Sequence, residues 1–492
     1  MDTLGDVFEA VVRRHASRTA IVEGDRALSY ADLERRARAL AEALHEGGVA
    51  PGHRVAVMLP NGSACVASYL AVVRAGAVVV PLNDRYERGE LVRFLTASRA
   101  SCLVTSAESG PLARSVLDDI GAQGALLVVD GGGMVVSSRG RAVSAAAAPP
   151  PNAAAPVLHQ FSSGSTGRPK SIVRTHANLV AELDAFARTL AFSPGDRFLG
   201  VTPFSHVNGL MRSMLASLHA GATLYPLPRF ERQAVARLIE DHRLSVFIAV
   251  PLMFTMLTRG HAERRADLSS LRWCVSGSAP LPRALNVAFH DSFGLYVRQL
   301  YGSTETGTIS VNTLPDVRET LESVGRPLAG VAVDVFADDG RPTADGEVGE
   351  LGIRSPAAIR GYDEADAPER TAFRDGYYLT GDLGRKDRDG LLYLVGRKTL
   401  LINRGGYKVN PREIEELLES HPKIAEAVVL GVPTPFGDER IRAVVVTSAP
   451  CTEAEIVEHC RGRIADFKIP STVEIRDSLP KSVTGKVRRD AV

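Results

Sequence analysis

Apolar positions along the first 250 residues follow two spacings in turn, which predict helices and buried strands. Residues 29–48 have the helical spacing, with Ser29 as N-cap and a Gly-Gly pair that ends the helix. Residues 63–76 repeat it. Nearly continuous apolar runs rich in β-branched residues occupy 54–60, 77–83, 245–251 and 271–277. Strands of this kind are buried on both faces, so the pattern predicts an α/β fold of parallel or mixed sheets covered by helices.

The pattern changes past about residue 330, where short strands lie between glycine turns. The segment from 398 to the end predicts a separate small α+β domain. Residues 410–422 predict a helix with Asn410 as N-cap, Pro411 at the first helical position and Glu413 two residues later, in a capping-box pattern. Residues 137–156, rich in Ala and Pro, predict a flexible surface connection.

Composition excludes several classes of function. The chain has 492 residues, 45% of them hydrophobic and 23% charged, with a net charge of +1. Such a balance gives no global field toward nucleic acid or a membrane surface. No apolar run reaches the roughly 18 residues of a membrane span, and the N-terminus lacks a signal-peptide core. Five scattered cysteines without a C-x-x-C motif indicate free thiols in the cytoplasm.

The stretch HQFSSGSTGRPKSIVRTHANL, residues 159–179, has the residue types of a phosphate-binding loop. A P-loop that starts at Gly164 needs its second glycine where Pro169 stands, so this loop is of another kind. Glycines let backbone N–H groups approach phosphate oxygens, and hydroxyl groups add donors.

Five motifs occur in one order along the chain, and together they carry a resemblance. They are SSGSTGRPK (162–170), YGSTETG (301–307), YLTGDLG (378–384), GRKTLLINRGGYKVNPREIE (396–415) and LPKSVTGKVRRD (479–490). Through these motifs the chain resembles the adenylate-forming superfamily, which includes acyl- and aryl-CoA synthetases. The resemblance covers nearly the whole chain. The resemblance implies a large ATP- and acid-binding domain (1–396), a hinge (397–399) and a small mobile domain (400–492).

The resemblance also implies the reaction and its participants. A carboxylate would attack the α-phosphate of ATP, expel pyrophosphate and leave as acyl-AMP, which an acceptor then attacks. Tyr301 would stack on adenine, Thr304 would lie near the α-phosphate and Glu305 would hold Mg²⁺. Lys486 would stabilise the charge that builds between carboxylate and α-phosphate. The residues implied to bind the nucleotide are Ser162, Ser163, Gly164, Ser165, Thr166, Gly167, Lys170, Ser278, Ala279, Tyr301, Gly302, Asp382 and Arg397.

Three positions depart from the family pattern. Ser171 stands where the family usually has Gly after the lysine, and the hinge carries Thr399 and Leu400 where charged residues are common. These departures keep open a non-catalytic nucleotide-binding protein. A serine hydrolase is disfavoured because the chain has no G-x-S-x-G elbow.

The acid pocket would be lined by 203–212, 276–281 and 298–302, with His206 as the gate that shields the carboxylate. Phe204 and Ser205 stand where amino-acid-activating members place an Asp, which disfavours α-amino acids. Leu300 replaces a common Gly and shortens the pocket, so an aryl or short-to-medium acid is expected. The residues implied to bind the acid are His206, Val207, Asn208, Ser276, Gly277 and Leu300.

Two further points stay open at this stage. Arg212 could pair with a second carboxylate, but its place on the helix after the loop favours solvent or a phosphate. The acceptor is expected to be the thiol of CoA, reached past Gly405, Gly406 and Tyr407. A carrier-protein thiol and an amine remain alternatives.

Overall fold

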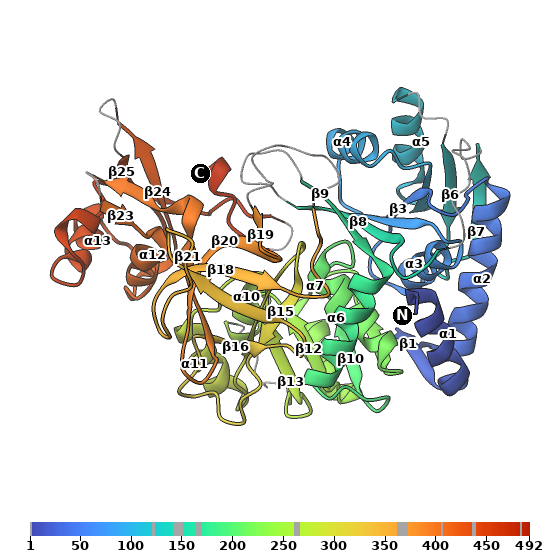
Figure 1. Cartoon of the computed structure of the whole chain (residues 1–492), viewed down its shortest axis with the longest axis horizontal. Coiled ribbons are helices and arrows are strands. Elements are labelled where there is room, and N and C mark those ends of the chain that lie inside the picture. The colour runs from blue at the N-terminus through green and yellow to red at the C-terminus, as the bar shows by residue number, and fades with distance from the viewer. Residues whose placement is uncertain are drawn as a thin grey trace. The chain divides into compact units, whose positions relative to one another are not determined.

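The computed structural model describes residues 2–120, 124–140, 151–162, 170–259, 266–361, 372–404, 407–434, 439–482 and 485–492 (Figure 1). Two compact units make up the chain. The first comprises 1–321, 328–331 and 354–373, and the second comprises 322–327, 332–353 and 374–492. No helix among the described residues is both long enough and apolar enough to cross a bilayer.

A seven-stranded sheet forms one half of the first unit, in the order β7-β6-β5-β3-β4-β8-β9. Its inner strands are parallel, and β7 and β9 are antiparallel edges. The helices α4 and α5 cover one face, and α2 and α3 cover the other (Figure 1). The bounds are α2 Tyr30–Glu46, β3 Arg54–Met58, α3 Ser63–Arg74, β4 Val78–Leu82, α4 Arg88–Ser98, β5 Cys102–Ser106, α5 Gly110–Asp119, β6 Ala125–Val129, β7 Val135–Arg139, β8 Pro156–Ser162 and β9 Lys170–Thr175.

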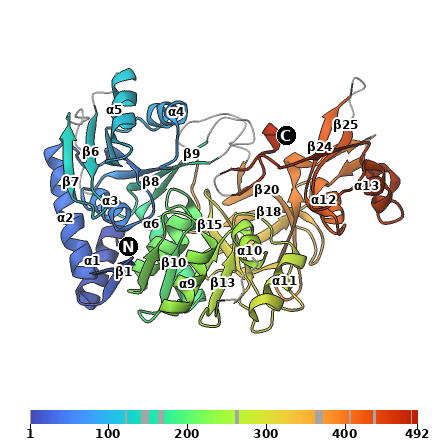
Figure 2. The ribbon, with the colours of Figure 1, turned by 180° about the vertical axis from the view of Figure 1, so that it is seen from behind.

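A second sheet of the first unit runs β2-β1-β11-β10-β12-β13-β14-β15. The strands from β1 to β14 are parallel to their neighbours in this order. Figure 2 shows α9, α10 and α11 along one face, where they bury one apolar cluster. The bounds are α1 Leu4–His15, β1 Thr19–Glu23, β2 Arg26–Ser29, α6 His176–Thr189, β10 Arg197–Gly200, α7 Val207–Gly209, α8 Ala216–His219, β11 Thr223–Pro226, α9 Arg232–His242, β12 Val246–Ala249, α10 Pro251–Thr258, β13 Trp273–Ser276, α11 Arg283–Phe293, β14 Arg298–Ser303 and β15 Gly307–Val311.

The largest apolar core lies between the two sheets and joins them through α1, α3, α6 and α8. The sequence predicted parallel and mixed sheets with helices on both faces, and the structure confirms this architecture. Ser29 caps α2 as predicted, with its hydroxyl accepting from the backbone N–H of Asp32, and Gly47 ends the helix. All five cysteines are free thiols.

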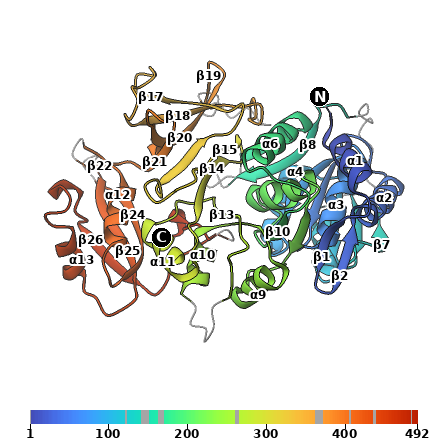
Figure 3. The same cartoon turned by 90° about the horizontal axis from the view of Figure 1, so that it is seen from below.

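The second unit contains three small sheets, in the orders β17-β18-β20-β21-β16, β22-β23 and β24-β25-β26. The helices α12 and α13 pack on one face of the third sheet (Figure 3). The bounds are β16 Ser323–Pro327, β17 Ala332–Phe336, β18 Gly349–Arg354, β19 Phe373–Arg374, β20 Tyr377–Lys386, β21 Leu392–Arg397, β22 Ile402–Arg404, β23 Tyr407–Val409, α12 Pro411–Glu419, β24 Ile424–Pro433, β25 Glu439–Thr447, α13 Glu453–Cys460 and β26 Thr472–Arg476.

Two local predictions need correction. The capping box at α12 is only half formed, because Asn410 accepts from the N–H of Arg412 while the Glu413 carboxylate binds Lys468 at 2.6 Å. A cation within reach offers Glu413 a charge-assisted partner, which is stronger than a backbone N–H. The predicted flexible connection starts later than residue 137, since β7 continues to Arg139; residues 141–150 lie outside the described residues.

The last turn of α12 generates a testable prediction about stability. Burial raises the pKa of Glu419 to about 7, and the Arg412 guanidinium opposes this only weakly across 4.0 Å. The folded-state pKa exceeds the unfolded one, so this group stabilises the fold below about pH 4.5 and loses that contribution as pH rises to 7. Glu419→Gln should therefore raise the free energy of unfolding by about 1–3 kcal/mol more at pH 8 than at pH 5.

Thermal unfolding at both pH values checks this expectation, with the exposed Glu416→Gln on the same helix as the control. An equal change in Tm at pH 5 and pH 8 would show that Glu419 titrates normally.

Candidate functional site

The loop between β10 and α7 carries the predicted gate and is held by buried side chains. The Asn61 amide donates to the carbonyl oxygens of Gly200 (3.1 Å) and Thr202 (3.0 Å). Its own oxygen accepts from the N–H of Phe204 at 2.8 Å. Tyr69 donates its hydroxyl to the Phe204 carbonyl at 3.0 Å. The backbone before His206 is thus fixed by the first sheet rather than left as a free loop.

Gly209 and a π-helical turn determine how the chain leaves this loop. A Cβ at Gly209 would lie 2.3 Å from the carbonyl oxygens of Thr202 and Pro203, so only glycine fits. The chain then continues as a π-helix over Leu210–Leu215 before α8 begins. Such π turns are rare and are found mostly at functional sites, because the extra residue re-aims the side chains around it.

His206 has an uncharged imidazole. Burial lowers its pKa to about 4, and its Nε2 is buried without a hydrogen-bond partner among the described residues. A neutral ring can donate one hydrogen bond but cannot form an ion pair. This suits a group that borders a carboxylate without neutralising it.

The other residues predicted to bind the acid converge on the carboxyl ends of β13 and β14. A Cβ at Gly277 would lie 3.3 Å from Leu300 Cδ2 and 3.6 Å from Asn208 Oδ1, so these three residues are neighbours. Ser276 is buried, and its hydroxyl has no partner among the described residues. Val207 opens α7 and packs against the central core. Ligands of open α/β sheets bind at this edge, so these residues lie where a ligand is expected.

Arg212 is buried beside these residues, contrary to the expectation that it faces solvent. Its side chain is 1% exposed. Its Nε donates to Thr308 Oγ1 at 3.0 Å, and its Nη1 donates to Asn208 Oδ1 at 3.3 Å. The sequence pattern assumed an ordinary α-helix after the loop, and the π turn invalidates that assumption.

A buried ion pair between Arg174 and Glu182 is connected to Arg212 through the hydroxyl of Thr308. Glu182 and Arg174 are both buried, with Arg174 Nη2 2.6 Å from Glu182 Oε2. The other carboxylate oxygen accepts from the N–H (2.9 Å) and the hydroxyl (2.7 Å) of Thr308. Although burial raises the pKa of Glu182, the two guanidiniums and these bonds hold it below its ordinary value. Sequence reasoning missed Arg174, Glu182 and Thr308, because no local motif links β9, α6 and β15.

The segment 301–307 turns between β14 and β15. Tyr301 is buried, and Gly302 is half-buried. The hydroxyls of Ser303 and Thr306 lie 2.9 Å apart and close the turn that carries Thr304 and Glu305. Glu305 is buried, and its carbonyl accepts from the N–H of Ile359 at 2.9 Å.

Ser278 and Ala279 follow β13, and Ser278 is exposed in a left-handed conformation with φ of 70°. Such a backbone costs about 1 kcal/mol or more in a residue other than glycine, and strain of this kind concentrates at ligand sites.

The predicted phosphate loop is described only at its ends. Ser163, Gly164, Ser165, Thr166 and Gly167 lie outside the described residues, whereas Ser162 and Lys170 face each other across the β8–β9 hairpin. The departure at Ser171 has a structural role, since its hydroxyl lies 2.6 Å from Nε2 of the buried His159. This bond ties the two strands together at the base of the loop.

Three of the residues predicted for nucleotide binding and catalysis lie in the second unit. Asp382 and Arg397 are cross-strand neighbours on β20 and β21, with Arg397 Nε 2.7 Å from Asp382 Oδ1. Lys486 lies in a tight turn in which its backbone N–H donates to the Ser482 hydroxyl at 3.2 Å. Although much of its side chain is exposed, local desolvation and then the charge of Arg397 lower the pKa of Lys486, while Asp382 raises it.

The hinge and the acceptor segment are described in part. Residues Lys398–Leu400 form one 3-10 turn, and Lys398 binds Glu350 at 3.0 Å and Asp338 at 3.4 Å. These two bonds help raise the pKa of Lys398, so the charged contact lies one residue before Thr399. Gly405 and Gly406 lie outside the described residues, and Tyr407 begins β23.

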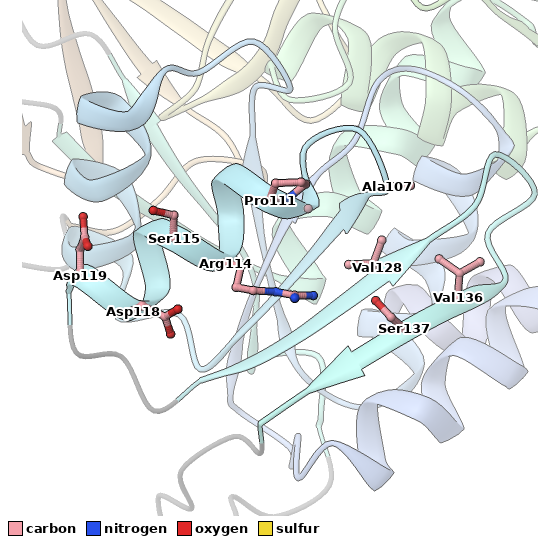
Figure 4. Close-up of a pocket in the computed structure, with 10 residues that line it drawn as sticks. Ala107, Pro111, Arg114, Ser115, Asp118, Asp119, Val128, Val136 and Ser137 are labelled. Atoms are coloured by element: carbon pink, nitrogen blue, oxygen red, sulfur yellow. The ribbon is translucent and has the colours of Figure 1, made fainter.

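A surface depression of about 670 Å³ lies elsewhere, between α5 and the strands β6 and β7 (Figure 4). Figure 4 shows Arg114 directed over Val128, with Asp118 and Asp119 farther along the helix. Its lining includes none of the residues predicted for ATP or acid binding, so it is separate from the pocket at the strand ends.

The environment of His206 predicts its titration. We expect the imidazole to stay uncharged from pH 6 to 8 and to titrate near pH 4, because burial disfavours its charged form. Ring chemical shifts followed by NMR across pH 3.5–8.5 measure this pKa, with His206→Phe identifying the resonance. A midpoint near 6.5 would contradict the buried site described above.

Comparison with known proteins identifies the family of the chain. The family model described as AMP-binding enzyme matches residues 8–363, and the model for the AMP-binding enzyme C-terminal domain matches 413–486. A sulfoacetate–CoA ligase of Cupriavidus necator is 33% identical, over 94% of this chain and 91% of its own length. An oxalate–CoA ligase of Arabidopsis thaliana is 32% identical, over 100% and 98%. A feruloyl-CoA synthase of an Amycolatopsis species is 34% identical, over 96% and 95%.

Solved structures agree with the family assignment. ATP-bound MatB from Rhodopseudomonas palustris has a TM-score of 0.89 at 29% identity, covering 100% of this chain and 98% of its own. The amide bond synthetase McbA from Marinactinospora thermotolerans has a TM-score of 0.86 at 29% identity, covering 99% and 98%. The fold and the family predicted from the motifs are thus confirmed. The chain belongs to the AMP-binding enzyme family and is an AMP-forming ligase of carboxylic acids.

Proposed function

We propose that this enzyme activates a short or aryl carboxylic acid as its acyl-adenylate and transfers the acyl group to the thiol of CoA. The observation that carries the proposal is the group of residues gathered at the carboxyl end of β13 and beside it on β14. There His206 and Ser276 each bury a polar atom that has no partner among the described residues. Buried polar atoms of this kind are costly unless a ligand satisfies them. The adjoining turn, 301–307, is the adenine motif of the family.

The residues that the motifs name would hold ATP. The loop from Ser162 to Lys170 would bind the β- and γ-phosphates, and Tyr301 would stack on adenine beside Gly302, Ser278 and Ala279. The Asp382–Arg397 pair would bind the ribose, since a carboxylate accepts from hydroxyl groups and its arginine keeps it ionised and oriented. Glu305 offers the hard carboxylate oxygen that Mg²⁺ prefers, and the cation would supply charge neutralisation of the phosphates. Thr304 would hydrogen-bond near the α-phosphate.

The first chemical step forms a bond between the acid's carboxylate oxygen and the α-phosphorus while the bond to pyrophosphate breaks. Negative charge gathers on the α-phosphate oxygens, where the Lys486 ammonium would stabilise it. In the second step the CoA sulfur bonds to the acyl carbon, the thiol proton leaves, and AMP departs with the bonding electrons. Gly405, Gly406 and Tyr407 would border the path of the thiol.

Two parts of the proposal need separate arguments: the size of the acid, which depends on Leu300, and the identity of the acceptor. Leu300 is buried against Gly277, so the wall it forms favours a short or flat acid over a long chain. The acids named for the relatives differ in class, so they do not identify the acid that this enzyme activates. The CoA ligases among the relatives favour CoA, whereas the likeness to an amide bond synthetase favours an amine as the second candidate.

Pyrophosphate release with MgATP, over a panel of short, aryl and long acids with and without CoA, tests this function. We expect sustained turnover with short or aryl acids only when CoA is present. A single burst of about one equivalent of pyrophosphate per enzyme, unchanged by CoA, would show that the adenylate waits for an amine or a carrier thiol. No pyrophosphate release with any acid, together with retained ATP binding, would indicate a non-catalytic protein.

Lys486→Ala should lower acid-dependent pyrophosphate release by roughly 100-fold or more, because the variant loses a cation positioned for the transition state. The matched control is Lys481→Ala, which removes a cation from the same segment. Lys481 binds Glu426 at 2.7 Å, a partly exposed pair whose loss costs little. Equal losses in both variants would mean that Lys486 acts through the fold of the segment rather than through the reaction.

A further inference from the structure

The guanidinium of Arg212 lies beside the residues predicted to bind the acid, close to Gly302 and Gly277. A Cβ at Gly302 would lie 2.5 Å from its Nη2, and one at Gly277 would lie 3.8 Å from its Nη1. Both positions lack a side chain, so the guanidinium occupies the space beside the ends of β13 and β14. Nη1 donates to Asn208, and Nε donates to Thr308. These two bonds fix its plane.

The remaining nitrogen, Nη2, is buried and has no hydrogen-bond partner among the described residues. A guanidinium carries five donors, and Arg212 is 1% exposed, so water does not compensate for the missing bond. The hydroxyl of Ser276, at the end of β13, is also buried and has no hydrogen-bond partner among the described residues. A polar group of a ligand that reached Nη2 and this hydroxyl would satisfy both.

The charges around Arg212 do not balance. Two buried guanidiniums, Arg174 and Arg212, share one buried carboxylate, Glu182. Both oxygens of that carboxylate are engaged, one by Arg174 and one by Thr308. Arg212 reaches Glu182 only through the Thr308 hydroxyl. Burial lowers the pKa of Arg212 to about 10, which still leaves it cationic at neutral pH. The cluster of Arg174, Glu182 and Arg212 therefore holds a net positive charge away from water, which is costly unless an anion pairs with it.

We propose that Arg212 binds a second anionic group, a carboxylate or a sulfonate, carried by the acid that the enzyme activates. The proposal rests on the function proposed above and narrows it to short acids with an anion at each end. Leu300 and Asn208 lie beside the guanidinium, so the spacer between the two anions must be short. A neutral acid in this pocket would leave the cation unpaired, and sites with such unpaired groups reject the wrong substrate strongly.

The first test needs no variant. Pyrophosphate release with MgATP is measured for succinate against succinamate and for malonate against malonamate, pairs that differ only in the distal charge. Sulfoacetate separates sulfonate from carboxylate recognition. We expect kcat/KM to be at least about 100-fold higher for each dianion than for its amide.

An equal or higher kcat/KM for the amides would overturn the proposal while leaving the ligase function intact. If no acid releases pyrophosphate, the ligase function fails. The proposal is then decided by the rise in Tm that succinate and succinamate produce in the presence of MgATP. A rise with succinate alone supports an anion site, and equal or absent rises overturn it.

The second test uses Arg212→Met, which keeps the length of the side chain and removes its charge. We expect KM for the preferred dianion to rise by at least about 100-fold, kcat/KM for its amide to stay level or increase, and KM for ATP to stay unchanged. The control is Arg54→Met, which removes a partly buried arginine of β3 that donates to the carbonyl of Ser98 at 3.0 Å and lies outside the segments predicted to line the acid pocket. A uniform loss for dianion and amide would mean that Arg212 only supports the fold. If circular dichroism shows that Arg212→Met does not fold, the comparison of acids on the unmodified enzyme decides.

Discussion

The register of the parallel strands that end at the acid pocket is the constraint on which the rest of the site depends. Ala249 of β12 pairs with Ser276 of β13, and Ser276 pairs with Gln299 of β14. The ends of β12 and β13 therefore lie level with Gln299 in β14, which continues to Ser303. Gln299 also fixes two segments outside the strands, because its side-chain amide accepts from the N–H of Leu281 and donates to the carbonyl of Leu321. Gly277 and Leu300 take their positions from this ladder, and a slip of one residue would turn the pocket wall to the other face of the sheet.

A buried carboxylate connects the pocket to the nucleotide turn. Glu182 of α6 binds both Thr308 of β15 and Arg174 of β9, and Arg174 also donates to the carbonyl of Ala357 at 3.2 Å. Gly307 fits against this cluster because a Cβ there would lie 2.5 Å from the carboxylate. One ion pair thus connects the start of β15, the strand β9 and the segment near residue 357.

Local sequence signals predicted those parts of the molecule whose causes are local. Apolar spacing located the strands and helices, Ser29 was identified as a cap, and the motif order identified the family. The sequence could not predict the burial of Arg212, because neither the close packing of Gly209 nor the π turn over Leu210–Leu215 has a local sequence signal. Tertiary partners likewise decided the half-formed capping box at Asn410 and the bond between Ser171 and His159. The roles assigned to the site residues remain predictions, since they concern bound molecules.

Gly209 has a consequence for how this enzyme could diversify. The chain there touches two carbonyl oxygens so closely that its path tolerates no added atom, and Asn61 and Tyr69 hold the same loop from the other side. Mutations can therefore exchange Asn208 or Arg212 without displacing the backbone that presents them. New substrate preferences would arise by replacing side chains on a rigid frame, and insertions in this loop would be purged. An evolutionary record of the pocket should consist of substitutions, with the spacing between β10 and α8 kept constant.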